Sequence, residues 1–178
     1  MRYLFNLRSY KEFKSWVIPI VTSIVAVLFI RKFVFMISYI PSTSMVHTLE
    51  VGDRLFCVNV MLLDDIKRQD IIVFKHSVKN KEQLLVKRVI GLPGDKVRID
   101  KGVVYVNGEK LQEDYLGSHS DYTGSFAVPD DKYLVLGDNR AVSSDGSRWA
   151  NPFIEVKDVK YKALFRVYPF NRFGNFTN

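Results

Sequence analysis

The hydrophobic residues of this chain form one long run near the N-terminus and many short runs after it. Trp16 to Ile30 is almost wholly apolar, interrupted only by one proline, one threonine and one serine. Arg31 and Lys32 can extend their charged ends toward lipid head groups, and residues 33–36 are again apolar. The segment thus approaches the roughly 20 residues that span a bilayer. We therefore predict a transmembrane anchor over residues 15–36.

The charges that flank this run predict its orientation. One acidic residue, Glu12, precedes it together with four basic ones, Arg2, Arg8, Lys11 and Lys14. The positive-inside rule then leaves residues 1–14 in the cytoplasm as a basic N-terminus and sends the rest of the chain outside the cell membrane. A cleavable signal peptide would need small residues at its cleavage site, whereas the stretch after Ile30 is charged and then bulky. A buried helix of a soluble protein is a further alternative, against which the basic flanks argue.

After the anchor the apolar runs are short and rich in β-branched and aromatic residues, as is typical of strands. No long helical period is visible there, so we expect an all-β domain of short antiparallel strands over residues 37–170. Asn107-Gly108 predicts a tight hairpin turn, Glu113 to Gly124 a polar loop, and residues 171–178 a loose polar tail. The predicted strands are Val34–Ile40, Arg54–Val60, Asp70–Phe74, Leu84–Ile90, Lys96–Ile99, Val103–Val106, Tyr133–Leu136 and Tyr161–Tyr168.

Composition and charge limit the classes of partner that this chain is expected to bind. The 178 residues, 47% hydrophobic and 25% charged, suit one globular domain plus an anchor. The formal net charge is +7, but no clustered basic motif of a nucleic-acid-binding protein accompanies it. An anionic membrane surface explains the charge more simply, so we expect membrane lipid and no nucleic acid as a partner. The single cysteine, Cys57, lies in an apolar run and is expected to be buried.

Ser44 and Lys87 are the candidate catalytic residues. A serine hydroxyl needs an adjacent base to act as a nucleophile at neutral pH. None of the three histidines has the local sequence of a Ser-His-Asp enzyme, so a lysine is the natural candidate. Lys87 lies between the apolar runs 84–86 and 89–90, which can lower the pKa of its amine by burial. Taken alone, however, Pro41 to Ser44 would read as an ordinary turn.

Several ordered blocks of this sequence resemble the type I bacterial signal peptidases, membrane-bound serine proteases with a Ser-Lys dyad. Ser42-Thr43-Ser44-Met45 is similar to the nucleophile block of that family, and Lys87 to Val97 to its lysine block. Gly137-Asp138-Asn139-Arg140, continued to Arg148, is similar to the third block. Asp70 to Phe74 and Lys162-Ala163 are weaker matches.

The resemblance implies a role for each matching residue. Ser44 would be the nucleophile and Lys87 the general base, and this chemistry needs neither metal nor cofactor. The Ser42 hydroxyl and the Ser44 N–H would form the oxyanion hole, which stabilises the charged intermediate. Ser143 would orient the lysine. The residues expected to support the site by hydrogen bonds and ion pairs are Asp138, Asp145 and Arg148, with Arg88 as a structural or solvated neighbour of the base.

The resemblance also implies the substrates, which are signal peptides of exported preproteins. A peptide would lie extended beside the strands that end at Ile40 and Val86, held by main-chain pairing and by shallow pockets. These pockets would admit small side chains, such as alanine. The residues that match apolar pocket positions are Ile40, Met45, Leu49, Leu85 and Val86.

The chain departs from the family pattern at four positions. His47 stands where proline is usual, Gln69 replaces the usual glycine before Asp70, Gly146 is inserted between Asp145 and Ser147, and Pro152 stands where glycine is common. His47 could act as a base, but Lys87 is present, so we expect a surface turn residue. Gly146 could shift Arg148 and loosen the support of the lysine. For Asp138 and Asn139, which are typical of turns, we expect local hydrogen bonds to the backbone.

Two functions follow from these patterns. The first is an active membrane-anchored serine endopeptidase that cleaves after small residues. The second is a divergent relative that assists assembly of surface or pilus proteins without cleaving signal peptides. Degenerate relatives tend to lose the nucleophile or the lysine. Because this chain keeps both, the sequence favours the enzyme.

Overall fold

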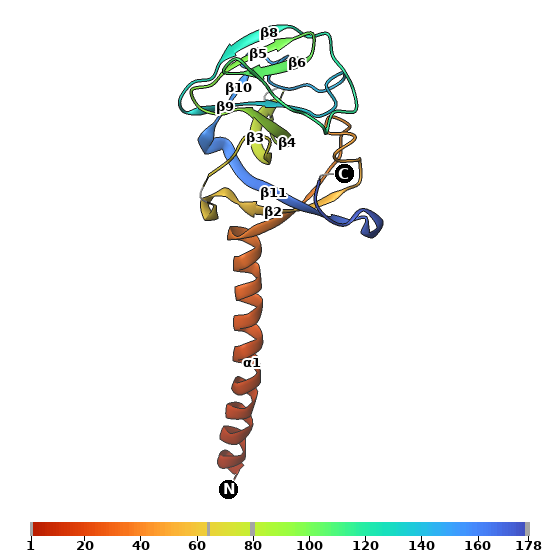
Figure 1. The fold of residues 1–178 in the computed structure, drawn as a ribbon. Coiled ribbons are helices and arrows are strands. Elements are labelled where there is room, and N and C mark those ends of the chain that lie inside the picture. The colour runs from red at the N-terminus through yellow and green to blue at the C-terminus, as the bar shows by residue number, and fades with distance from the viewer. Residues whose placement is uncertain (1, 64, 79–80, 177–178) are drawn as a thin grey trace. The chain divides into compact units, whose positions relative to one another are not determined.

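The computed structural model describes residues 2–63, 65–78 and 81–176 (Figure 1). Helix α1 (Arg2–Phe33) forms one unit with the two residues after it, and residues 36–178 belong to a second. Within α1, Glu12–Ile30 has a mean hydropathy of 2.1, and none of that segment is buried in protein. Its 19 residues are long and apolar enough to cross a membrane.

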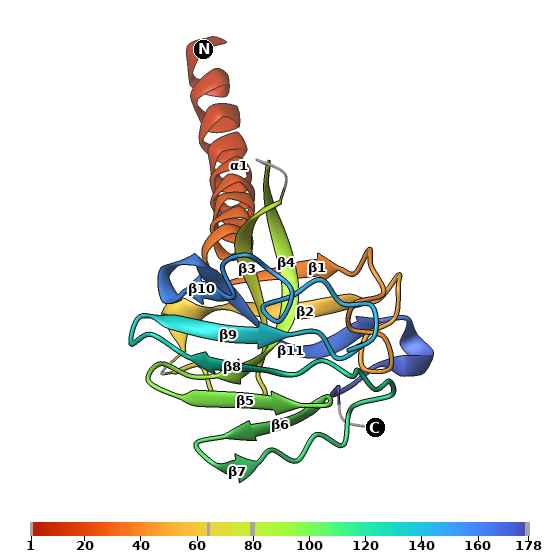
Figure 2. The same cartoon turned by 90° about the horizontal axis from the view of Figure 1, so that it is seen from above.

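The second unit contains two antiparallel sheets (Figure 2). The larger has seven strands in the order β1 (Phe35–Tyr39), β2 (Arg54–Asn59), β11 (Val159–Tyr168), β3 (Ile71–Val78), β4 (Lys81–Gly91), β9 (Lys132–Leu136) and β10 (Phe153–Glu155). The smaller has four strands in the order β7 (Glu109–Lys110), β6 (Val103–Val106), β5 (Lys96–Asp100) and β8 (Gly124–Ala127). Short 3-10 helices lie at Val60–Leu62 (η1), Val156–Asp158 (η2) and Phe170–Arg172 (η3).

The apolar side chains of β4 and β9 alternate between two cores, as the period of a strand requires. Ile90 and Leu134 point into the core shared with the four-stranded sheet, which also contains Val97 and Val104. Val89 and its neighbours on β9 point to the opposite face, where they pack with residues of β3, β10 and β11. Each fully buried large apolar side chain stabilises the fold by about 1.5–3 kcal/mol.

A third core fixes the segment that follows β1. Ile40, Met45 and Leu49 pack against Leu55 and Cys57 of β2, together with residues of β3 and β11. Met45 and Leu49 are 1% and 0% exposed, so the loop between them is anchored at both ends. The burial of Cys57 is as expected, and burial raises the pKa of its thiol to about 12.

Strand β4 is longer than the neighbour on one of its sides. With β3 it pairs over residues 81–88, from Lys81↔Val78 to Arg88↔Ile71. With β9 it pairs only from Arg88 to Gly91. On the side away from β3, residues 81–87 therefore have no strand partner within the described part of the chain, and such an edge can accept an extended peptide.

The predicted fold class is confirmed, and each predicted strand overlaps an observed one. Three short strands, β7, β8 and β10, were not predicted, because they have two to four residues and no run of β-branched side chains. The expectation of a loose tail is wrong for the described residues 171–176. There, Gly174 exchanges backbone hydrogen bonds with Arg166, Arg172 pairs with Asp53, and Phe176 packs against the core of β2.

Candidate active site

The candidate nucleophile lies in a compact loop between β1 and β2. Backbone N–H groups of Val46 and Leu49 donate to the carbonyl oxygens of Thr43 and Met45, at 3.1 and 2.7 Å. The Ser44 hydroxyl lies 3.4 Å from the Ser42 hydroxyl. Among the described residues, no backbone acceptor takes the N–H of Ser44. Two hydroxyls and one N–H group therefore lie at the same point of the loop.

Lys87 lies near the end of the unpaired edge of β4, opposite Ile72 of β3. It is only 4% exposed. Burial lowers the pKa of its amine from 10.5 to about 8, although the carboxylates of Asp145 and Asp138 act in the opposite direction. An amine with this pKa is neutral in an appreciable fraction of molecules near pH 7, as a general base requires.

A groove of about 550 Å³ brings these groups together. Its lining includes Ser42 and Ser44 from the loop and Lys87 from β4. Four of the five predicted pocket residues also line it: Ile40, Met45, Leu85 and Val86. The structure does not bring Leu49 to the groove, because that side chain is fully buried in the core. Residues of β1 form one wall and the unpaired half of β4 another.

The loop after β9 contains the third sequence block and is hydrogen-bonded to the nucleophile loop. The side-chain amide of Asn139 donates to the carbonyl oxygen of Thr43, and its backbone N–H donates to the carbonyl oxygen of Ser44, both at 3.1 Å. Ser118 in turn donates to Oδ1 of Asn139 at 3.0 Å. The expectation of local side-chain bonds is therefore wrong for Asn139, and also for Asp138, whose carboxylate accepts from Arg88 and Thr48.

Ser143 follows within the same loop and is 1% exposed. Its hydroxyl oxygen has no hydrogen-bond partner among the described residues. A Cβ atom on Gly137 would lie 2.2 Å from this oxygen and 2.5 Å from the carbonyl oxygen of Ser44. Only glycine allows the third block to approach the nucleophile loop so closely. A buried hydroxyl without a partner is costly and calls for a functional explanation.

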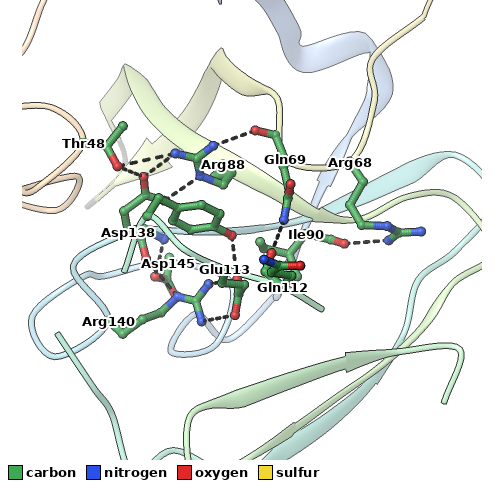
Figure 3. A network of polar contacts seen from close by, with 12 residues as sticks. Thr48, Arg68, Gln69, Arg88, Ile90, Gln112, Glu113, Asp138, Arg140 and Asp145 are labelled. Atoms are coloured by element: carbon green, nitrogen blue, oxygen red, sulfur yellow. Dashed lines mark hydrogen bonds and ion pairs between the residues drawn. The ribbon is translucent and has the colours of Figure 1, made fainter. Parts of the chain in front are cut away.

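Asp138 and Arg88 form a buried ion pair behind the site (Figure 3). The guanidinium donates from Nε and Nη2 to the two carboxylate oxygens at 2.9 and 2.6 Å. Thr48 donates its hydroxyl to the same carboxylate. Of the two predicted alternatives for Arg88, the structural one is correct. The pair joins β4, the nucleophile loop and the third block.

A second buried ion pair joins Glu113 to Arg140 (Figure 3). Their side chains are 6% and 7% exposed, and Nε of Arg140 donates to the carbonyl oxygen of Gly137 at 3.1 Å. The ring of Tyr115, whose hydroxyl donates to Glu113, lies under the Arg88 guanidinium at 3.7 Å. The polar loop predicted over residues 113–124 is thus packed against the third block.

Asp145 shapes the turn that ends this block. Its carboxylate accepts the backbone N–H of Gly137 at 2.8 Å, and the N–H and hydroxyl of Ser147 at 3.1 and 2.8 Å. Arg148 contributes a hydrogen bond, because its guanidinium donates to the carbonyl oxygen of Ala141 at 2.8 Å. The described residues contain no group of three or more His, Cys, Asp or Glu side chains that could hold a metal ion.

Comparison with known proteins assigns the chain to a family. Residues 13–168 match the family described as signal peptidase, peptidase S26. The chain belongs to the signal peptidase family. It is 42% identical over 164 residues to a probable signal peptidase I-2 of Synechocystis, covering 89% of this chain and 74% of that protein.

Two further relatives and one solved structure are similar. Identity to signal peptidase I of Bacillus licheniformis is 39% over 169 residues, covering 88% of this chain and 89% of that one. Identity to signal peptidase IB of Staphylococcus aureus is 36% over 184 residues, covering 92% and 93%. A crystal structure of an Enterococcus faecalis signal peptidase I has 31% identity and a TM-score of 0.47, covering 54% of this chain and 94% of that one.

Two departures from the signal peptidase pattern, His47 and Gln69, lie at positions with a positive φ. His47 has a φ of 83°, which proline cannot adopt. Its ring packs against Gly117, and it lines a separate cavity of about 800 Å³ and not the groove. Gln69 has a φ of 70°, the left-handed region that favours the usual glycine. Hydrogen bonds to Gln112 and from Arg88 hold it there.

The inserted Gly146 packs tightly against β9. Its N–H donates to the carbonyl oxygen of Val135 at 3.1 Å, and a Cβ atom would lie 2.5 Å from the carbonyl oxygen of Pro152. The insertion therefore occupies a close approach that only glycine permits, while Asp145 keeps its bond to Gly137.

Sequence reasoning missed two residues of the site region. Asn139 belongs to the Gly-Asp-Asn-Arg run, but its distant partner Thr43 could not be read from spacing. Trp149 lines the groove and is the single tryptophan outside α1. An isolated tryptophan in a polar segment was the signal that could have pointed to it.

Proposed function

We propose that this chain is a membrane-anchored serine endopeptidase that cleaves signal peptides from exported preproteins, with Ser44 and Lys87 as its dyad. The observation that carries the proposal is the buried Lys87, whose pKa is lowered to about 8, in the groove that also contains Ser44. Membership in the signal peptidase family gives the reaction class.

In this mechanism the neutral Lys87 amine accepts the Ser44 proton as the hydroxyl oxygen attacks the scissile carbonyl carbon. The resulting ammonium then returns the proton to the leaving amine, and an acyl-enzyme remains. Water, deprotonated by the same lysine, hydrolyses the ester and releases Ser44. The carboxylates of Asp145 and Asp138 stabilise the transient ammonium, since both raise the pKa of Lys87 against the effect of burial.

The Ser42 hydroxyl and the Ser44 N–H would stabilise the negative oxygen of the tetrahedral intermediate. The 3.4 Å separation of the two hydroxyls and the uncommitted N–H support this role. Ser143 would orient the lysine amine. In support, its hydroxyl is buried without a partner within the described chain.

The substrate would bind as an added strand on the unpaired edge of β4. Residues 81–87 have main-chain groups that can pair with a peptide there. Residues of β1 also line the groove. Ile40, Met45 and Val86 line the groove together with Ser44, and by the family resemblance they would form shallow apolar pockets for small side chains beside the scissile bond. We therefore propose cleavage after small residues.

The membrane supplies the second partner. The basic residues before the apolar segment of α1 favour a cytoplasmic N-terminus and an extracellular catalytic domain. On β1 and the adjacent strands, Ile37 and Tyr39 are 47% and 56% exposed, and Phe56 stacks on Phe165 at 5.1 Å. Exposed aromatic side chains such as Tyr39 suit the lipid–water interface. Deleting residues 1–32 would then leave cleavage of soluble peptides but impair that of membrane-inserted precursors.

The testing experiment is cleavage of a signal-peptide substrate by the full chain in detergent, beside Ser44→Ala and His47→Ala. The wild type and His47→Ala should cleave after a small residue, and Ser44→Ala should be inactive while retaining the wild-type unfolding temperature. Binding of the peptide without cleavage by the wild type would favour the non-processing alternative.

A further inference from the structure

Trp149 forms one wall of the groove, and the proposed chemistry assigns no role to this residue. The residue lines the same groove as Ser44 and Lys87. Its backbone N–H donates to the carbonyl oxygen of Asp145 at 3.0 Å, so one turn of chain carries both residues. The close packing of Gly146 on β9 fixes where this turn lies.

Three contacts hold the indole in place. One face stacks on the His76 ring, with centroids 4.0 Å apart and an angle of 18°. Phe74 meets the indole edge-on at 6.3 Å. The indole N–H donates to the Ser144 hydroxyl at 3.3 Å. An aromatic side chain held in this way presents a rigid apolar surface at small entropic cost.

The register of the sheet places this surface along the groove. Phe74 and His76 lie opposite Leu85 and Gln83 of β4, which are two and four residues before Lys87. At about 3.3 Å per strand residue, the indole lies about 7–13 Å from Lys87 along the strand. A peptide that pairs with the β4 edge therefore passes Trp149 two to four residues away from the one beside the dyad.

We infer that Trp149 is a specificity-determining residue that contacts large apolar substrate side chains at the fourth and fifth residues before the scissile bond. This inference rests on the proposed function, in which the substrate pairs with the edge of β4, and it takes the acyl side of the peptide as the part that lies along residues 81–87. Leu85 packs in the same apolar cluster as Trp149, and both line the groove, so the wall is apolar on two sides. A signal peptide has its apolar segment just before the cleavage region and would supply such side chains.

The test uses the full chain in detergent and two quenched peptides with alanine at the first and third residues before the bond. One peptide carries leucine at the fourth and fifth residues, and the other carries serine there. Wild type should prefer the leucine peptide roughly tenfold in kcat/KM, mainly through KM, for about 1.4 kcal/mol of contact. Trp149→Ala should reduce this ratio to near one, Trp149→Phe should retain most of it, and His76→Ala should give an intermediate ratio.

A ratio unchanged in Trp149→Ala, or an equal loss on both peptides, would overturn the inference. A second measurement detects contact with Trp149 directly and leaves this side chain intact. In a Trp16→Phe, Ser44→Ala chain, Trp149 is the single tryptophan, and its emission should shift when the leucine peptide binds; binding without a shift would also overturn it. Failure of the proposed function is distinct, because the wild type would then cleave neither peptide or Ser44→Ala would cleave as well as the wild type.

Discussion

The side-chain amide of Asn139 donates a 3.1 Å hydrogen bond to the carbonyl oxygen of Thr43, the residue before the candidate nucleophile. This bond links the third sequence block to a loop that lies 96 residues earlier. Together with the backbone bond from Asn139 to Ser44, it sets the direction of the peptide group between Thr43 and Ser44. The N–H of that peptide group is the proposed backbone donor of the oxyanion hole.

Asn139→Ala should therefore lower kcat about tenfold with little change in KM, since a misdirected donor costs less than the 10²–10³ of a deleted one. Ser118→Ala is the matched control, because it removes only the bond to Oδ1 of Asn139 and should lower kcat less. Steady-state kinetics on one peptide measure both variants. An Asn139→Ala enzyme with wild-type kcat would contradict this role.

The pH dependence of kcat/KM should report Lys87 in the free enzyme. Because burial lowers its pKa to about 8, activity should rise roughly tenfold from pH 7 to 9 as the amine loses its proton. A stopped-flow or plate assay over pH 6–10 gives the profile. A rising limb near pH 6.5 that disappears in His47→Ala would instead assign the base to the histidine.

Lys87 should also reduce the stability of the fold at neutral pH. In the unfolded chain its pKa is 10.5, and in the folded chain about 8, so between these values the unfolded state binds more protons and stability rises with pH. Below pH 8 the folded state carries the full cost of the buried charge. Lys87→Met should thus raise the free energy of unfolding by up to about 3 kcal/mol at pH 7. In denaturant titrations this gain should shrink between pH 8 and 10.5, and a loss at pH 7 would contradict the account.

Substitution of the neighbouring Arg88 by methionine should lower the stability of the fold, whereas that of Lys87 should raise it. Arg88→Met leaves the carboxylate of Asp138 buried without its charged partner, since that side chain is 0% exposed. Removing one member of a buried pair costs about 3–5 kcal/mol. Chemical denaturation of Arg88→Met should show this loss, and the double variant Arg88→Met, Asp138→Leu should recover part of it. A neutral single variant would show that the pair contributes no net stability.

Gly137→Ala should abolish cleavage with only moderate loss of stability. Its methyl group would meet Ser143 Oγ at 2.2 Å and the Ser44 carbonyl oxygen at 2.5 Å, so the third block must move away from the nucleophile. Gly108→Ala is the control, because nothing lies within 4 Å of its position and only its φ of +93° adds strain. Activity of Gly137→Ala equal to that of Gly108→Ala would show that the close approach is unnecessary.

Local patterns were sufficient to predict the longer strands and the dyad candidates. β-branched runs such as Val103–Val106 predict strands because their side chains fit a pleated surface. The apolar flanks of Lys87 predicted its burial correctly. The weaker strands β7, β8 and β10 depend on pairing with distant neighbours, and nothing in their own residues specifies it.

Contacts between residues that are distant in the sequence could not be predicted from such local patterns. The partners of Asn139, the stacking of Trp149 on His76 and the burial of Glu113 with Arg140 all join segments that sequence spacing does not relate. The pocket prediction for Leu49 was wrong for a related reason. An apolar residue near a nucleophile can face either the groove or the core, and here the core between β2 and β11 contains it.

The most direct test of the Ser44-Lys87 dyad is to trap the acyl-enzyme. The full chain would be mixed with an activated ester of a peptide that ends in alanine, quenched in acid and analysed by intact mass and peptide mapping. The account predicts one acyl group on Ser44 in the wild type, none in Ser44→Ala, and none on the same timescale in Lys87→Met. Acylation of Lys87→Met at the wild-type rate, or an acyl group on another residue, would contradict it.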